Sequence, residues 1–150
     1  MQALLEVVVL EVADPDASLS FYRDLVGFDL DVDYAPSSTF RVVQLTPPGS
    51  STSIQFGKGL HVPRASLRGL CLVVSDLVKS RQELRDRGVD VSEISHKDTD
   101  GGWQGGYLPG VDANRTDYAS FAYFDDPDGN GWVLQERGHR PHRESITENP

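Results

Sequence analysis

The sequence is poor in cysteine, in positive charge and in long apolar runs. Cys71 is the only cysteine among 150 residues, so an internal disulfide is excluded, and a reducing cytoplasm is the expected compartment. Lysine and arginine number 14 against 23 acidic residues, giving a net charge of −9, which disfavours nucleic acid and anionic membrane surfaces as partners. No apolar run is long enough to cross a bilayer. These absences leave a globular, acidic protein with 38% hydrophobic residues.

One sequence pattern occurs twice. An aspartate follows an apolar stretch, a serine comes four residues later, and a glycine ends the helix-forming segment. The members are Asp14, Ser18 and Gly27 in the first half and Asp76, Ser80 and Gly88 in the second. The offset is 62 residues at the aspartate and the serine and 61 at the glycine. The repeat predicts two copies of one unit that pack on each other, with a seam between them that favours a ligand.

Each half predicts the order β-α-β-β-β. Aspartate caps and terminal glycines bound helices at 14–27 and 76–88, and β-branched runs separated by turn residues indicate the strands. The expected strands are 3–12, 28–34, 39–46 and 52–56 in the first half, and 67–74, 89–94, 118–124 and 131–136 in the second. Residues 138–150 are a polar tail. The fold class is therefore α+β with strongly curved mixed sheets.

Two phrases point to a known group. The first runs Asp14, Ser18, Phe21-Tyr22, Leu25 and Gly27, and the second is Asp126-Pro127-Asp128-Gly129-Asn130. Over residues 3–137 the chain resembles the glyoxalase/bleomycin resistance/dioxygenase superfamily, the vicinal oxygen chelate proteins. The resemblance implies a single domain of two βαβββ modules, about 3–60 and 65–137, whose sheets form a cup around a ligand or metal. Its members include lyases, isomerases, ring-cleaving dioxygenases and drug-sequestering proteins, so it fixes fold better than function.

The family metal positions lack ligands. In metal-dependent relatives four strands each supply one inward histidine, glutamate or glutamine, and the motifs place these positions at Val7, Gln55, Gly69 and Val133. Only Gln55 offers a donor, and one amide oxygen cannot hold a transition metal. No single register shift restores a ligand set. We therefore expect no metal and no other cofactor, and we expect Val7, Gln55 and Val133 to form part of a ligand-binding surface.

Glu11 and His96 are the candidate catalytic residues. Glu11 shares the odd-numbered face of Val7, where glutathione-using relatives carry an arginine that holds a substrate carboxylate. An acid there argues against an ordinary glyoxalase I, and it predicts either a general base or ligand clamp, or an ion pair with Arg41 or Arg137. His96 ends a strand and precedes a charged segment, so it either faces the cleft mouth or is a surface histidine.

The long glycine-rich segment 97–117 predicts a ligand-proximal loop. It carries Trp103 and Tyr107, whose rings can close over a flat apolar ligand, although a surface loop or a dimer contact would use the same residues. Cys71, among apolar neighbours, is expected to be a buried, inert thiol. His139 belongs to the polar tail and is expected to be solvated.

The leading hypothesis is a glyoxalase-like protein that binds a small, partly aromatic organic compound without a metal. It either sequesters that compound or transforms it by acid–base chemistry, and the sequence does not distinguish an enzyme from a binder. The alternatives are a metal-dependent lyase, isomerase or dioxygenase of the same superfamily, and a regulatory or scaffold domain. Small two-module proteins of this family are often dimers, so we expect a homodimer, with no nucleic acid or membrane partner.

Overall fold

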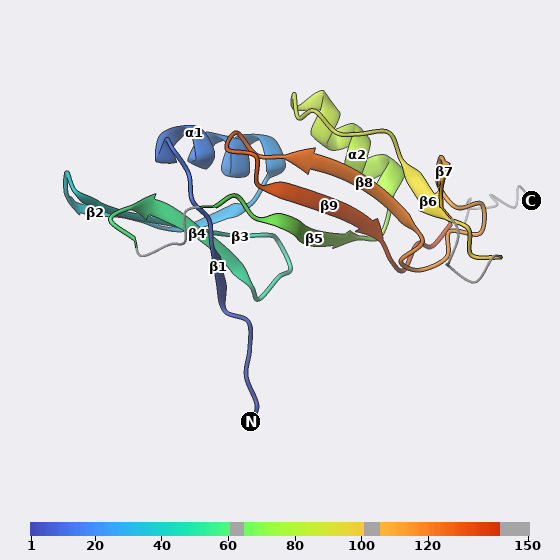
Figure 1. The fold of residues 1–150 in the computed structure, drawn as a ribbon, viewed down its shortest axis with the longest axis horizontal. Coiled ribbons are helices and arrows are strands. Elements are labelled where there is room, and N and C mark those ends of the chain that lie inside the picture. The colour runs from blue at the N-terminus through green and yellow to red at the C-terminus, as the bar shows by residue number, and fades with distance from the viewer. Residues whose placement is uncertain (61–64, 101–105, 142–150) are drawn as a thin grey trace, which may run out of the picture.

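The first module forms a four-stranded sheet. The structure is a computed structural model that describes residues 1–60, 65–100 and 106–141 (Figure 1). The elements are β1 (Val7–Val9), α1 (Pro15–Ser20), the π-helical turn η1 (Phe21–Val26), β2 (Asp29–Ser37), β3 (Phe40–Thr46) and β4 (Ser53–Lys58). The strand order is β1-β4-β3-β2; β1 is parallel to β4 and the other pairs are antiparallel. We call this sheet A.

The second module repeats the arrangement with one extra strand. Its elements are β5 (Arg68–Val74), α2 (Leu77–Asp86), β6 (Ser95–Lys97), β7 (Tyr107–Pro109), β8 (Ser120–Asp125) and β9 (Gly131–Glu136). The order is β5-β9-β8-β6-β7, and β5 is parallel to β9. We call this sheet B. Two mixed sheets with few helices confirm the predicted α+β class of two βαβββ-like modules, an arrangement consistent with the two-module cup.

One predicted strand is wrong. Residues 89–94 are not a strand, and the pairing to β8 is made by β6, which begins at Ser95. The apolar signal came from Val89 and Val91, which are each 5% exposed and pack in the core without joining the sheet. The neighbouring strand β7 lies inside the segment that was expected to be a loop. Burial therefore produced the pattern that sequence reading assigned to a strand.

The repeated pattern reflects repeated caps. The Asp14 carboxylate accepts hydrogen bonds from two N–H groups of the first turn of α1, and the Asp76 carboxylate accepts one from Lys79 in α2. Gly27 and Gly88 follow the helical segments with φ of 89° and 95°, the left-handed region that glycine adopts without strain. None of the helices in the described part of the chain has the length and apolar character that a membrane crossing requires.

The Asp126–Asn130 turn joins the two modules. The Tyr22 hydroxyl donates to Asp126 Oδ2 at 2.7 Å and accepts from the Trp132 indole N–H at 3.0 Å. Asp128 Oδ1 accepts from the backbone N–H of Ala13 at 2.9 Å. Burial and the adjacent Asp126 raise the pKa of Tyr22 well above its ordinary value, so it remains a neutral donor. These acids stabilise the turn itself and hold one module against the other.

Each sheet has one covered and one open face. In β3, Val43 and Leu45 are fully buried while Gln44 between them is not, and in β9 the buried Trp132 and Leu134 alternate with Val133. The buried residues form one core with apolar residues of both helical segments. Figure 1 shows α1 and α2 along the same side of the molecule. We call the side in the core the helix-covered face and the other side the open face.

Candidate functional site

A directed chain of hydrogen bonds crosses the open face of sheet A. The Gln55 amide donates to Gln44 Oε1 at 3.2 Å, and the Gln44 amide donates to Ser53 Oγ at 3.4 Å. The hydroxyls of Ser53 and Thr46 are 2.7 Å apart, and Thr46 donates to the Asp31 carboxylate. Every donor therefore points toward Asp31. We call these five residues the polar strip, which sequence reading missed although the alternation in β3 signalled it.

The four family metal positions do not fit a transition metal. Val7 lies on the open face of sheet A beside Ser53, and Gln55 already uses its amide on Gln44. Gly69 has φ of 86°, so a ligating side chain there would be strained. Valine at 133 has no lone pair. The donor set thus consists of one amide oxygen, too few for a stable site.

Val133 lies on the open face of sheet B, on the second strand from the β5 edge. Its cross-strand neighbours are Cys71 on β5 and Tyr123 on β8. Cys71 is exposed, so the expectation of a buried thiol is wrong; alternation along β5 turns it to the open face. Its thiol donates to Gln135 Oε1 at 3.5 Å, and partial burial raises its pKa, which favours the neutral form over a reactive thiolate.

Aromatic side chains continue this open face onto β6, β7 and β8. The Tyr107 ring meets Phe121 edge to face, with centroids 5.8 Å apart, and Lys97 Nζ lies 4.5 Å from the Tyr107 centroid. The Tyr123 side chain is hydrogen-bonded to Tyr107, and burial together with Tyr107 raises the pKa of Tyr123. We call Lys97, Tyr107, Phe121 and Tyr123 the aromatic patch. Trp103, predicted beside Tyr107, lies outside the described residues.

Glu11 is exposed just beyond β1. It follows the open-face residues Val7 and Val9 at the same strand phase, and its backbone carbonyl accepts from the Asn130 amide at 3.4 Å. Within the described ranges its carboxylate makes no ion pair. The predicted alternative partners are engaged elsewhere: Arg41 pairs with two aspartates, and Arg137 lies over a tyrosine ring.

His96 lies on the helix-covered side of β6. Its cross-strand partners are Leu108 and the fully buried Ser120, and its Nδ1 is 2.8 Å from the Gly110 carbonyl oxygen. The structure therefore separates the predicted site residues. Val7 and Gln55 share the open face of sheet A, Val133 and Tyr107 share that of sheet B, and His96 faces the opposite way.

The seam between the modules holds an apolar cavity of about 370 Å³. Val8 and Ile54 line it from sheet A, and Leu70 and Trp132 line it from sheet B. A ligand-sized space at the predicted seam is present, but the predicted ligand-binding residues on the open faces are not among its lining. The cavity nevertheless meets both open faces, because Ser53 of sheet A and Cys71 of sheet B are also among its lining residues.

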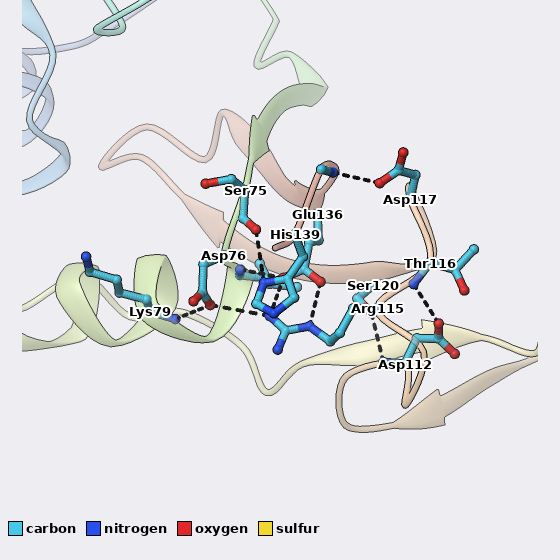
Figure 2. Close-up of polar contacts among 12 residues, drawn as sticks. Ser75, Asp76, Lys79, Asp112, Arg115, Thr116, Asp117, Ser120, Glu136 and His139 are labelled. Atoms are coloured by element: carbon cyan, nitrogen blue, oxygen red, sulfur yellow. Dashed lines mark hydrogen bonds and ion pairs between the residues drawn. The ribbon is translucent and has the colours of Figure 1, made fainter. Parts of the chain in front are cut away.

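A second polar cluster lies at the start of α2 (Figure 2). Glu136, fully buried at the end of β9, accepts from Arg115 Nε at 2.7 Å and from Arg115 Nη2 at 2.6 Å. Its Oε2 also accepts from the Leu77 N–H at 2.7 Å. Arg115 Nη2 reaches Asp76 Oδ1 at 3.3 Å. One guanidinium therefore joins the helix cap to the last strand.

This cluster is a structural joint. Asp76, Glu136 and His139 place possible metal-ligating atoms within 4.8 Å of one another, but the Arg115 guanidinium already supplies the positive charge. Burial opposes ionisation of Glu136, yet the bonds from Arg115 and Leu77 outweigh it and hold its pKa below the ordinary value. His139 is half-buried, 3.3 Å from the Ser75 carbonyl oxygen, and not fully solvated as expected.

The loop before β8 is built to present Arg115. Arg115 and Tyr118 have φ of 49° and 65°, a region that costs energy for residues other than glycine. The Asp112 carboxylate accepts from Thr116 N at 2.8 Å, and Asp112 N donates to Ser120 Oγ at 2.9 Å (Figure 2). These bonds hold the strained turn in one conformation. Sequence reading missed the joint, although an acid at the buried phase of β9 signalled a partner.

Comparisons with known proteins agree with the fold and the resemblance. The family model described as Glyoxalase/Bleomycin resistance protein/Dioxygenase superfamily matches residues 4–134. Among curated proteins there is no match. Solved structures of other proteins align over most of the chain.

TnmS3, an antibiotic binding protein from Streptomyces sp. CB03234, is 29% identical, with a TM-score of 0.64 over 90% of this chain and 96% of its own. A glyoxalase/bleomycin resistance protein from the same strain is 30% identical, with a TM-score of 0.60 over 86% and 96%. A member of the same superfamily from Sphaerobacter thermophilus DSM 20745 is 23% identical, with a TM-score of 0.65 over 91% and 98%, a likeness of fold alone.

Proposed function

The chain belongs to the glyoxalase/bleomycin resistance protein/dioxygenase superfamily, and on this premise we propose that it binds a small, partly aromatic organic compound on the open faces of its sheets. The observation that carries the proposal is the aromatic patch, where Tyr107 and Tyr123 are 55% and 40% exposed on a strand face that also carries Val133. Exposed rings on a pleated face favour stacking with a flat ligand. The antibiotic-binding neighbour TnmS3 supports a small-molecule ligand.

Binding in this proposal needs no metal. The positions that hold a metal in metal-dependent relatives carry Val7, Gly69 and Val133, which offer no ligand atom, and Gln55, which offers one neutral amide oxygen while its Nε2 donates to Gln44. A metal-dependent lyase, isomerase or dioxygenase would need donors that these residues do not supply. Metal-independent binding is therefore better supported than a metal-dependent activity.

Glu11 is the residue we propose for a clamp or general base. Its exposed carboxylate follows Val7 and Val9 at the open-face phase of β1 and has no ion-pair partner in the described chain. Replacement by glutamine keeps the shape and removes the charge. We expect Glu11→Gln to change ligand affinity or turnover at least tenfold while the free energy of unfolding changes by less than about 0.5 kcal/mol. Unchanged binding and turnover would remove Glu11 from the site.

We also propose a homodimer. All nine residues of the edge strand β2 are exposed, and Leu30, Val32 and Tyr34 among them are 39%, 39% and 56% exposed. A long edge strand with apolar side chains is a template for pairing with another chain. Light scattering at micromolar concentration should give twice the chain mass, and Val32→Lys should lower it. A wild-type monomer would refute the assembly. The cytoplasm stays a prediction from the single cysteine.

A thermal-shift panel tests the binding proposal. Planar aromatic compounds should raise Tm, whereas aliphatic compounds of equal size should not. A ligand at 100 times its Kd stabilises the native state by about 2.7 kcal/mol, a shift of roughly 5–10 °C for a chain of this length. Tyr107→Leu should reduce the shift, and the matched control Tyr34→Leu should not. No shift from any aromatic compound would refute the proposal and favour a scaffold role.

A further inference from the structure

We propose that the apolar cavity between the two modules, which we call the seam cavity, binds an uncharged organic compound of about two to three rings. The cavity is bounded by β1, β4, β5 and β9, and no member of the aromatic patch is among its described lining. This site therefore goes beyond the proposed open-face function, and either one can fail while the other stands.

The seam cavity is open space between fixed walls. Its volume of about 370 Å³ lies in the range of small-molecule sites, and an apolar cavity of about 150 Å³ holds one benzene. A methyl group at Gly69 would have no heavy atom within 4 Å apart from its chain neighbours. On the opposite side, the Trp132 N–H donates to Tyr22 at 3.0 Å, and its ring lies parallel to Phe124 with centroids 6.1 Å apart. A ligand therefore meets walls that are already ordered.

The lining favours an uncharged ligand. None of the described residues that line the cavity carries a charge. The hydroxyls of Ser50 and Thr52 donate to backbone carbonyls at 3.1 and 2.8 Å, and the Ser53 hydroxyl is hydrogen-bonded within the polar strip. The Cys71 thiol donates to Gln135, and burial raises its pKa, so it stays neutral. A charged ligand would lose hydration here without gaining a partner.

The rim carries an apolar side chain that a ligand can cover. Leu5 lines the cavity and is 68% exposed. Its carbonyl accepts from the Thr52 hydroxyl at 2.8 Å, and the carbonyl of the next residue, Glu6, accepts from the Ser53 N–H at 3.0 Å. These bonds hold Leu5 at the rim while its side chain stays accessible. Contact with a ligand would remove that apolar surface from water, which favours binding.

Two fluorescent probes that differ by one sulfonate test the chemistry of the site. N-phenyl-1-naphthylamine is uncharged, and 8-anilinonaphthalene-1-sulfonate has the same rings with a negative charge. Each probe is titrated with the full chain, and its emission gives a Kd. The uncharged probe should bind about tenfold tighter, because the lining offers the sulfonate no partner. Equal Kd values, or no binding of the uncharged probe, would overturn the proposal.

Cys71 reports where the uncharged probe binds. It is the only cysteine of the chain, and it is exposed at the cavity. Saturating probe should slow alkylation of Cys71 by iodoacetamide about fivefold in mass spectrometry, because a covered thiol cannot be attacked. Unchanged alkylation in the presence of bound probe would place the probe elsewhere and overturn the proposal. Resistance that grows with protein concentration in the absence of probe would show a second copy in the cavity and would also overturn it.

Two matched pairs of variants complete the test. Leu5→Ser should weaken the uncharged probe about fivefold, whereas Leu4→Ser, 90% exposed and outside the lining, should not. Val8→Phe should fill part of the cavity and weaken the probe, whereas Val9→Phe, half-buried on the same strand, should not. Circular dichroism confirms the fold of each variant. Equal effects within both pairs would overturn the seam site. Tyr107→Leu should leave the protection of Cys71 unchanged, which separates this site from the open-face function.

Discussion

The buried ion pair of Arg115 and Glu136 allows a quantitative prediction. Glu136 is fully buried, and among the described residues the removal of the Arg115 guanidinium leaves the Leu77 N–H as the donor to its carboxylate. Breaking a buried pair costs about 3–5 kcal/mol because the surviving charge is stranded. The retained N–H bond places Arg115→Met at the lower end, so we expect a loss of about 3 kcal/mol, a large part of a total stability of roughly 5–15 kcal/mol.

Urea denaturation followed by circular dichroism measures this loss. With a slope of about 2 kcal/mol per molar urea, the midpoint should fall by roughly 1.5 M. Glu136→Gln should also destabilise, and the double variant should be less destabilised than the sum of the single changes, with a coupling of about 2 kcal/mol.

The matched control is the exposed pair of Arg68 and Asp125, whose side chains are 71% and 50% exposed. The cycle of Arg68→Met and Asp125→Asn should give a coupling of no more than about 0.5 kcal/mol. A coupling for Arg115 and Glu136 equal to that of the control pair would refute the role of the cluster as a joint.

Three other outcomes are expected. Asp128→Ala removes the acceptor for the Ala13 N–H at 2.9 Å and for the Ser18 hydroxyl at 3.5 Å. The free energy of unfolding should fall by about 1–2 kcal/mol, which lowers Tm, and an unchanged Tm would contradict the inter-module role. Glu136 and Asp76 have pKa values held below their ordinary 4.5 and 3.8, so their stabilisation should be complete above about pH 5 and lost as pH falls toward the folded values, which acid titration of unfolding would show; stability rising on acidification would contradict it. Protein purified without an affinity tag should carry well under one equivalent of transition metal by elemental analysis, and stoichiometric metal that resists dialysis would contradict the proposal.

The fold was largely predictable because the helix-capping residues and the pattern of buried apolar residues indicated the same elements. Asp14 and Asp76 are good caps wherever they stand, and Gly27 is needed at a positive φ whatever packs around it. Val89 and Val91 misled because apolar alternation records burial, and a core segment outside the sheet is buried as well. Boundaries also moved, and β1 is three residues long against the ten expected.

The candidate site was less predictable because it depends on pairing between strands. The polar strip needs the register of β2, β3 and β4, which brings Asp31 to Thr46 and Gln44 to Gln55. The alternation of side chains along a strand was enough to predict which face Gln55 and Val133 occupy. It did not predict the face of His96, which is set by the pairing of His96 with Ser120.

The hydrogen bonds of Tyr22 bear on how the nascent chain matures. Its partners Asp126 and Trp132 lie 104 and 110 residues further along the sequence. While the 104 residues that separate Tyr22 from Asp126 are being synthesised, the Tyr22 hydroxyl therefore lacks its acceptor and its ring lacks the Trp132 indole. Contacts of such long sequence separation form late and slowly. A chain that ends before residue 126 would expose the incomplete core. Formation of the β8–β9 hairpin is therefore the folding step that protects the newly synthesised protein from aggregation.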